Sequence, residues 1–296
     1  MSNDQRGYTI DSGRRTRRRI GFGVLGVLVV AIVAFVAINA AGGDDASGEA
    51  VGSDVKIGYN SAFASEERLL DYVASDVAPD YGLEIESVSL GDPQQIDRGV
   101  SEGQLDATIY EHKHWMQSQI DSGGFDVTAV QPIYKWAFAM YSEKYDDVAD
   151  LPDGATIGVP DDPSNQSQAL WLLERNGLIS LDPDVDPWTV QLDDVVDNPH
   201  DFDLKPLGLA VMPRSLGSID AGISYVDFYD SADVPDSESI LSTPAPAEFD
   251  AQLVVGGKHT DDPNIQKLIE LWKDPRIQDY LEQNGAPALF PVDAKS

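Results

Sequence analysis

Residues 151–170, L-P-D-G-A-T-I-G-V-P-D-D-P-S-N-Q-S-Q-A-L, contain the pattern that decides the fold. The apolar run at residues 155–159 lies between turn residues, which is typical of a short buried strand. Ser164 is a residue type that caps helices, and apolar residues recur after it at helical spacing. Asn176 and Gly177 are expected to end that helix. The segment therefore predicts a strand that leads through a short loop into a helix.

The same alternation of strand and helix is expected along most of the chain. Strand-like runs occur at residues 55–59, 83–86, 105–110, 127–131, 223–225 and 251–255. A first helix is expected to begin at Ser65, its N-cap, and to end at about residue 77. Further helices are expected at residues 93–102, 111–121, 264–272 and 275–283. This order favours an α/β fold with crossover helices, in which ligands bind beyond the carboxyl ends of the strands.

The charge of the chain excludes one class of partner. There are 20 basic and 51 acidic residues, which give a net charge of −31. Residues 1–41 hold six arginines and two aspartates, so the acidic excess lies entirely in residues 42–296. Such a surface repels phosphate, so we expect no nucleic-acid binding. Solubility at high salt and steering of a cationic ligand both remain open as reasons for the acidity.

The N-terminal segment indicates export. Residues 1–19 end in a run of arginines, and residues 20–41 are apolar and uncharged. At the rise of an α-helix this run is roughly 33 Å long, enough to cross the hydrocarbon core. It is longer than the usual apolar core of a signal peptide, which favours a retained single-pass transmembrane anchor over a cleaved signal. Residues 42–53 are expected to be a flexible linker, with the bulk of the chain extracytoplasmic at the cell membrane.

Several kinds of chemistry are missing from the sequence. The chain has no cysteine, so disulfides, thiolate metal sites and the acylated cysteine of a lipoprotein are excluded. No hydrolase, phosphate-loop or zinc-protease motif is present. His112 and His114 are two residues apart and would not share a helix face, so we expect no metal site. We therefore expect no enzyme activity and no cofactor.

Three segments resemble one family. Residues 151–170 resemble the L-P-D-G-A-x-I-A-I-P-N-D-P-S-N segment of the NlpA-type, methionine-binding lipoprotein family of ABC-transporter substrate-binding proteins. Residues 103–112 resemble its G-E-L-D-A-N-Y-F-Q-H, and residues 140–145 its L-Y-S-K-K-Y. The resemblance covers roughly residues 54–292. It implies a two-lobed type II periplasmic-binding-protein fold that serves a permease and its ATPase.

The resemblance also implies lobe boundaries. Residues 54–140 plus 245–296 would form lobe I, and residues 141–244 would form lobe II. The receptor domain is expected to be a monomer whose lobes close over the solute by bending near residues 136–142 and 251–255. An enzyme or an envelope scaffold on the same fold is the alternative, because a fold does not fix a function.

The ligand residues that the family implies transfer only in part. Asn165 and His112 are retained. Gln168 stands where the family has the arginine that grips the amino acid's carboxylate, and Asp227 stands where an asparagine contacts the ligand's polar end. Losing an arginine removes bidentate capture of a carboxylate, and an added aspartate favours an ammonium group.

The departures give a hypothesis about the solute. It is cationic or lacks a free carboxylate, and aromatic faces contact its charge. The alternative is that the aromatic residues fill the lobe cores, while Gln168 and helix-end amides hold a carboxylate. The expected ligand-binding residues are Tyr59, Tyr110, His112, Trp115, Tyr134, Trp136, Asn165, Gln168, Tyr225 and Asp227.

Overall fold

A computed structural model describes residues 53–292. The expected basic segment 1–19, the anchor at residues 20–41 and nearly all of the linker lie outside the described residues. Among residues 53–292, no helix is both long enough and apolar enough to cross a membrane.

Most strands belong to one mixed sheet in the order β2-β1-β3-β11-β4-β9-β5-β8, with β10 and β12 also paired to β4. Strands β6 and β7 form a separate two-stranded sheet. The strands are β1 (Ser53–Asn60), β2 (Leu83–Leu90), β3 (Ala107–His112), β4 (Val127–Tyr141), β5 (Thr156–Pro160), β6 (Ser180–Leu181), β7 (Val195–Asp197), β8 (Asp203–Leu207), β9 (Ala221–Tyr225), β10 (Ser239–Pro244), β11 (Ala251–Gly256) and β12 (Leu289–Phe290).

Helices connect and cover these strands. The α-helices are α2 (Ala64–Tyr72), α3 (Pro93–Ser101), α4 (Lys113–Gly123), α5 (Pro163–Arg175), α6 (Met212–Ser215), α7 (Val226–Asp230), α8 (Pro263–Leu271) and α9 (Pro275–Asn284). Helix α2 continues into a π-helical turn, Val73–Val77, and a 3-10 turn, Ala78–Tyr81. Further 3-10 turns are Val148–Asp150, Leu192–Asp194, Leu216–Ser218, Asp236–Glu238 and Ala247–Phe249.

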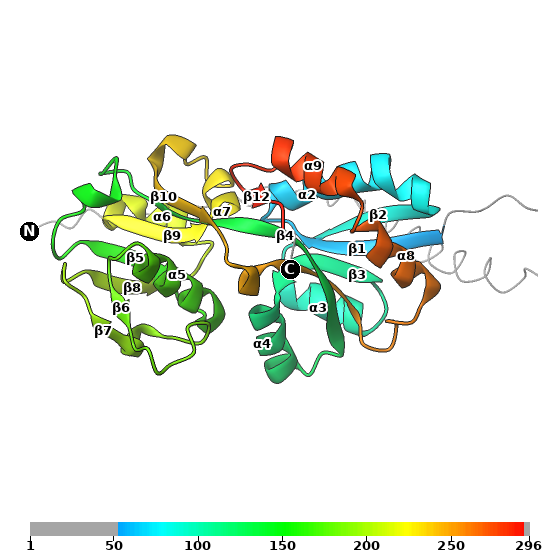
Figure 1. The fold of residues 1–296 in the computed structure, drawn as a ribbon, viewed down its shortest axis with the longest axis horizontal. Helices are drawn as coiled ribbons and strands as arrows, with labels where there is room; N and C mark the ends of the chain where they lie inside the picture. Colours follow the sequence, from blue (N-terminus) through cyan, green and yellow to red (C-terminus); the bar gives the residue numbers. More distant parts are fainter. Residues whose placement is uncertain (1–52, 293–296) are drawn as a thin grey trace, which may run out of the picture. The chain divides into compact units, whose positions relative to one another are not determined.

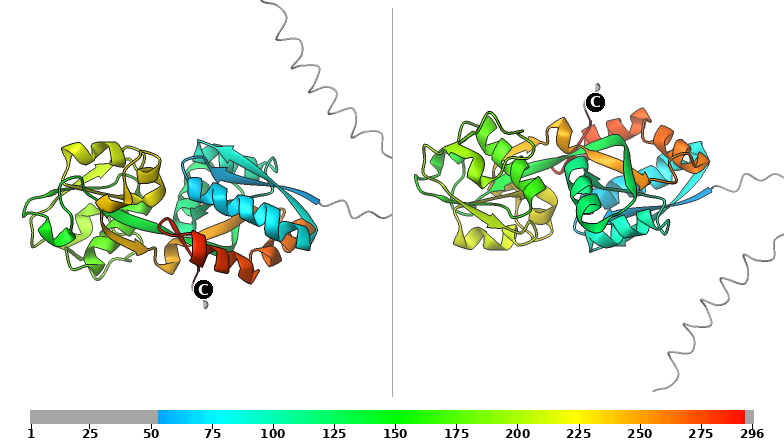
Figure 2. Two further views of the ribbon diagram at one scale, coloured as in Figure 1. Left: turned by 90° about the horizontal axis from the view of Figure 1, so that it is seen from above. Right: turned by 90° about the horizontal axis from the view of Figure 1, so that it is seen from below.

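Strand β4 connects the two ends of the sheet. Its first part pairs with β11, and its last part pairs with β9 and β10 (Figure 1). Both further views show β4 running from the elements around β1 and β3 to those around β5 and β9 (Figure 2). Nearly all of its second half is buried. One strand therefore contributes to the packing at both ends of the sheet.

The parallel strand pairs lie at the two ends of the sheet. Strand β1 is parallel to β2 and β3, while β5 is parallel to β8 and β9. Helices α3 and α4 lie against one face of the β1–β3 region, and α2, α8 and α9 lie on the other (Figure 1). Parallel strands need such crossover helices, so their carboxyl ends carry loops and helix N-termini.

The alternation of strands and helices expected from the sequence is confirmed for the longer elements. The strand at residues 127–131 was expected to end before Pro132, but β4 continues to Tyr141. Its pairing with β11 shifts register beside Pro132, which accommodates a residue that cannot donate a backbone hydrogen bond. Strand β8 was not among the expected strands; it contains Pro206 and lies at the edge of the sheet, where proline is tolerated.

Both expected helix caps are wrong. Asp162 caps α5, and its carboxylate accepts the Asn165 N–H at 2.9 Å. Pro163 takes the first helical position, where no N–H is needed, so the cap is the residue before it. Phe63 holds the cap position of α2, and Ser65 lies inside the first turn. Residues 111 and 112, expected in a helix, are the last residues of β3.

Gly158 in β5 gives a test of the packing. A Cβ at this position would overlap the Met212 sulfur and would lie 3.0 Å from Ile219 Cδ1. We expect Gly158→Ala to lower the free energy of unfolding by about 1–3 kcal/mol, because the neighbours must move. Urea denaturation measures this. Gly91→Ala is the control, since a Cβ there meets only the Ser61 hydroxyl, at 3.4 Å. Equal stabilities of the two variants would contradict the packing described for β5.

Candidate ligand-binding site

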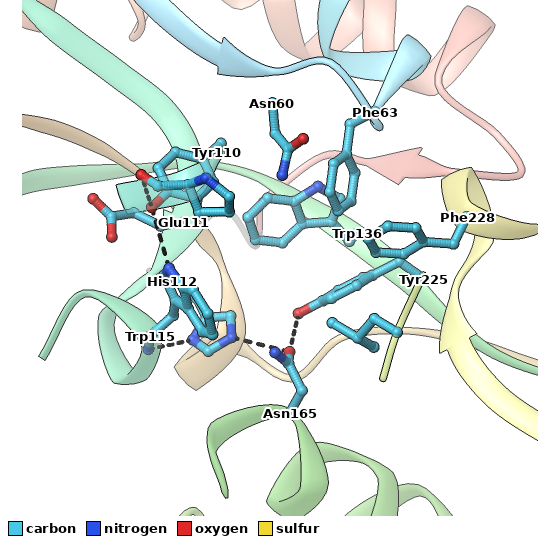
Figure 3. Close-up of a pocket in the computed structure, with 12 residues that line it drawn as sticks. Asn60, Phe63, Tyr110, Glu111, His112, Trp115, Trp136, Asn165, Tyr225 and Phe228 are labelled. Carbon is cyan, nitrogen blue, oxygen red and sulfur yellow. Dashed lines mark hydrogen bonds between the residues drawn. The ribbon is translucent and has the colours of Figure 1, made fainter. Parts of the chain in front are cut away.

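A cavity of about 100 Å³ lies where the carboxyl ends of β1, β3 and β9 meet the N-termini of several helices (Figure 3). Segments far apart in the chain contribute to it. The residues that line it are Asn60, Phe63, Pro93, Tyr110, Glu111, His112, Trp115, Trp136, Asn165, Leu209, Tyr225 and Phe228.

One wall of the cavity is aromatic. The ring of Phe63 packs against Trp136, Tyr225 and Phe228, with centroid distances of 6.1, 5.6 and 5.2 Å. Trp136 and Tyr225 are 5.5 Å apart. We call Phe63, Trp136, Tyr225 and Phe228 the aromatic wall. Its rings are in direct contact, so the wall is a continuous apolar surface rather than an open cage.

A buried carboxyl group supports this wall from behind. Glu66 is fully buried and accepts hydrogen bonds from the Tyr134 hydroxyl at 2.9 Å, the Trp136 indole at 3.3 Å and the Asn60 backbone N–H at 3.3 Å. Burial raises the pKa of Glu66 well above its ordinary value, and the nearby Asp227 adds to the rise. The three donors oppose the shift, since they stabilise the charged form.

A second carboxyl group lies behind the opposite wall. The Trp115 indole donates to the Tyr110 hydroxyl at 3.1 Å, which donates to Asp97 at 2.8 Å. Glu111, only 1% exposed, has no donor within reach of its carboxylate oxygens, but as a protonated acid it donates to Asp97. Burial raises the pKa of Asp97 to about 6, and burial beside Asp97 raises the pKa of Glu111 well above its ordinary value. The two carboxyl groups titrate together as one coupled pair.

A chain of hydrogen bonds crosses the cavity floor. His112 Nδ1 accepts the Trp115 backbone N–H at 3.1 Å, so the other ring nitrogen, Nε2, carries the proton and points at Asn165 Oδ1, 3.4 Å away. Burial lowers the pKa of His112 to about 3, which keeps the ring neutral. The Tyr225 hydroxyl lies 2.7 Å from the same Asn165 oxygen and 3.2 Å from Gln168 Oε1.

Asp227 is bound to the chain itself. Its carboxylate accepts the Ser65 backbone N–H at 2.9 Å and the Ser65 hydroxyl at 2.6 Å. Ser65 lies in the first turn of α2, whose cap residue provides no side-chain acceptor. Asp227, in α7, therefore does for α2 what an N-cap side chain would do. We call this contact the Ser65–Asp227 clasp.

The structure brings together six of the ten expected site residues on the cavity lining: Tyr110, His112, Trp115, Trp136, Asn165 and Tyr225. Tyr59, Tyr134, Gln168 and Asp227 are buried but lie outside the lining. Tyr134 donates to Glu66, Gln168 lies behind Tyr225, and Asp227 binds Ser65. Whether any of the ten contacts a solute stays a prediction.

Half of the residues that line the cavity were not expected from the sequence. Asn60 and Phe63 follow the expected strand at residues 55–59 directly, so the rule that ligands bind beyond strand ends could have found them. The same rule points to Glu111 once β3 is extended to residue 112. The sequence gives no comparable signal for Pro93, Leu209 and Phe228.

The next feature is the arrangement of the side chains that could bind a metal ion. Among residues 53–292, no group of three or more His, Asp or Glu side chains is placed to hold a metal ion. The rings of His112 and His114 have centroids 6.2 Å apart, and His114 packs on Phe249 at 5.1 Å.

Comparisons with known proteins agree with this architecture. A family model described as NlpA lipoprotein matches residues 55–292. The probable D-methionine-binding lipoprotein MetQ of Pasteurella multocida is 30% identical over 159 residues, which are 54% of this chain and 57% of that protein. The D-methionine-binding lipoprotein MetQ of Escherichia coli K12 is 27% identical over 227 residues, 75% of this chain and 82% of that protein. A nutrient-binding protein of Burkholderia cenocepacia, solved bound to methionine, superposes with a TM-score of 0.71 at 24% identity, covering 81% of this chain and all of that one. The described residues thus have the α/β mixed-sheet fold of periplasmic substrate-binding proteins.

The pH dependence of stability tests the buried acid pair. A carboxyl group whose pKa is raised in the folded state contributes stability below its ordinary pKa and loses it as pH rises through the folded value. For Asp97 this loss falls between about pH 4 and pH 6. We expect Asp97→Asn, which stays neutral, to gain roughly 2–3 kcal/mol on the native chain between pH 4.5 and 7.5 in urea denaturation.

The exposed Asp193 provides the control for this test. Asp193→Asn should follow the native chain at both pH values. If the Asp97→Asn and native stabilities keep the same difference at pH 4.5 and 7.5, the pKa of Asp97 is not raised as described.

Proposed function

The chain belongs to the NlpA lipoprotein family, and from this premise we propose that it is the extracytoplasmic solute-binding receptor of an ABC importer. It delivers methionine or a related small solute to a permease. The observation that carries the proposal is the cavity at the strand ends, lined by aromatic side chains and a few placed polar groups, as small-molecule sites are.

The receptor works by closing two lobes. Residues 54–140 plus 245–296 are lobe I, and residues 141–244 are lobe II, in a type II periplasmic-binding-protein arrangement. The cavity lies between them, because Asn60, His112 and Trp136 come from lobe I while Asn165 and Tyr225 come from lobe II. Hinge closure around the solute then buries it.

Two polar contacts support closure. The Ser65–Asp227 clasp joins α2 of lobe I to α7 of lobe II, and the His112–Asn165 contact joins the end of β3 to α5. Both must break when the lobes separate. Within residues 53–292, the chain passes between the proposed lobes in β4 and in the segment between β10 and β11. Bending near residues 136–142 and 251–255 would open them, and the second of these ranges directly follows the crossing segment.

The partners follow from this role. The closed receptor docks on a permease that an ATPase drives, and the receptor domain acts as a monomer. Residues 20–41 anchor it in the cell membrane, with the acidic bulk of the chain outside. We assign no catalytic step: the polar groups of His112, Trp115 and Tyr225 at the cavity are hydrogen-bonded to neighbouring side chains.

A screen tests receptor function. The purified chain is titrated with amino acids, methylated amines, osmolytes and short peptides while melting temperature and tryptophan fluorescence are followed. We expect one chemical class to raise the melting temperature and change the fluorescence, since Trp115 and Trp136 line the cavity. Uptake of that solute should depend on the chain. If no compound produces either signal, the receptor proposal fails.

Removal of the clasp tests closure. Asp227→Ala leaves the Ser65 N–H and hydroxyl without their acceptor, so the closed form is destabilised. We expect a larger radius of gyration in solution scattering and about tenfold weaker solute binding, which corresponds to about 1.4 kcal/mol.

The exposed Asp236 serves as the matched control, and Asp236→Ala should change neither quantity. Ser65→Ala removes the hydroxyl alone and should give a smaller effect of the same sign. Unchanged scattering and affinity in Asp227→Ala would mean that the clasp does not hold the lobes.

A further inference from the structure

We propose that the cavity holds a small organic cation without a free carboxylate, with its charged head on the aromatic wall and a hydrogen-bond acceptor on Asn60. This inference rests on the proposed receptor function and names the class of its solute. It follows from the side chains, helix N-termini and buried acids around the cavity.

The lining offers no positive charge to a carboxylate. Within residues 53–292, the twelve side chains that line the cavity include no lysine and no arginine. The position where the family resemblance places a carboxylate-gripping arginine is Gln168, which is 1% exposed. Its amide lies behind the Tyr225 hydroxyl and outside the lining. A neutral amide cannot replace bidentate, charge-assisted binding of a carboxylate.

Helix N-termini are the second means of holding a carboxylate, and residues at the starts of α2, α3, α4, α5 and α7 line the cavity. The five-residue α7 has no side-chain cap, but in each of the four longer helices one N–H already has a side-chain acceptor from the chain itself. Asp227 serves α2, Asp92 serves α3, His112 serves α4 and Asp162 serves α5. Three of these four acceptors are carboxylates. A carboxylate on the solute would therefore meet negative charge where a helix dipole would otherwise attract it.

The buried acids behind the walls also disfavour a carboxylate on the solute and favour a cation. Glu66 lies behind the aromatic wall, and the Asp97–Glu111 pair lies behind Tyr110 and Trp115. Burial makes their charged forms costly, and a cation in the cavity would stabilise those forms. The positive charge of Arg68 lowers the pKa of Asp227 in part, but the Arg68 side chain is exposed to solvent.

The aromatic rings are oriented for a cation. The Trp136 indole N–H donates to Glu66 and the Trp115 indole N–H to Tyr110, so both indole N–H groups are already bonded within the chain. A hydrogen-bond acceptor on the ring edge, a carboxyl group for Trp136 and a hydroxyl group for Trp115, shifts electron density toward the ring face. A cation over such a face gains about 0.5–2 kcal/mol. A thioether also packs well on aromatic rings, so the wall accepts a methionine side chain as well.

Asn60 supplies a positioned donor. It is 7% exposed, and its carbonyl oxygen accepts the Ala62 N–H at 3.0 Å, which fixes the orientation of the amide. Its NH₂ group then points into the cavity, toward Trp136 and the side of Tyr110 (Figure 3). One neutral donor suits a carbonyl, an ether or a hydroxyl oxygen of the solute.

A matched pair of solutes tests the inference. L-Methionine and L-methioninamide share the side chain and the ammonium group, and differ in that a neutral amide replaces the carboxylate. Isothermal titration at about pH 6.5 keeps both ammonium groups protonated. We expect methioninamide to bind at least tenfold more tightly than methionine. Equal or tighter binding of methionine overturns the inference and leaves the receptor function standing.

Choline covers the case in which neither methionine compound binds. Binding of choline, or of another carboxylate-free cation from the screen, supports the inference. A best ligand that carries a carboxylate overturns it. The absence of any ligand overturns the receptor function and this inference together.

A variant that adds a positive charge, and should thereby reverse the preference between the two solutes, provides the second test. Gln168→Arg should raise methionine affinity at least tenfold and lower that of methioninamide, because it places a cation behind Tyr225. Gln104→Arg adds the same charge at an exposed site and should change neither affinity. If Gln168→Arg leaves the ratio of the two affinities unchanged, a missing cation does not set the specificity.

Discussion

The fold depends on a single strand that serves two halves of one sheet. Backbone groups of β4 pair with β11 along its first part and with β9 and β10 along its last part. Because buried N–H and C=O groups must be paired, β4 cannot leave either half without breaking hydrogen bonds. Its buried side chains also belong to the main core, which includes Ile57 of β1 and Ile157 of β5. The positions of the loops that form the cavity follow from this shared strand.

The second constraint is the cost of burying acids. Glu66, Asp97, Glu111 and Asp227 are all nearly inaccessible to water, in a chain where acidic residues far outnumber basic ones. Glu66, Asp97 and Asp227 find hydrogen-bond donors in place of a basic partner, as with Tyr134 for Glu66 and Ser65 for Asp227, while Glu111 lies beside Asp97 without a donor. Buried carboxyl groups of this kind are tolerated when such donors are present. The same donors fix the orientation of the aromatic residues at the cavity.

The sequence predicted local elements better than side-chain directions. Strand β5 and helix α5 were found because their patterns lie within a few residues. The resemblance selected the right region for His112, Asn165 and Tyr225, which line the cavity. It could not show that Asp227 meets Ser65, since those residues are 162 positions apart and only the folded chain joins them. Nor could it show that Gln168 lies one layer behind Tyr225, because helix periodicity does not fix which neighbour covers a face.

The Ser65–Asp227 clasp has a kinetic consequence. Its two hydrogen bonds join groups of the chain alone, so their strength is the same whichever solute is bound. In the lobe opening proposed above, these bonds would have to break each time, which adds a barrier that does not depend on the bound solute. In the proposed receptor the clasp would therefore slow opening by the same factor for every solute. The lifetime of the closed form would be set partly by the protein, while the order in which different solutes are released would still follow their own contacts with the cavity.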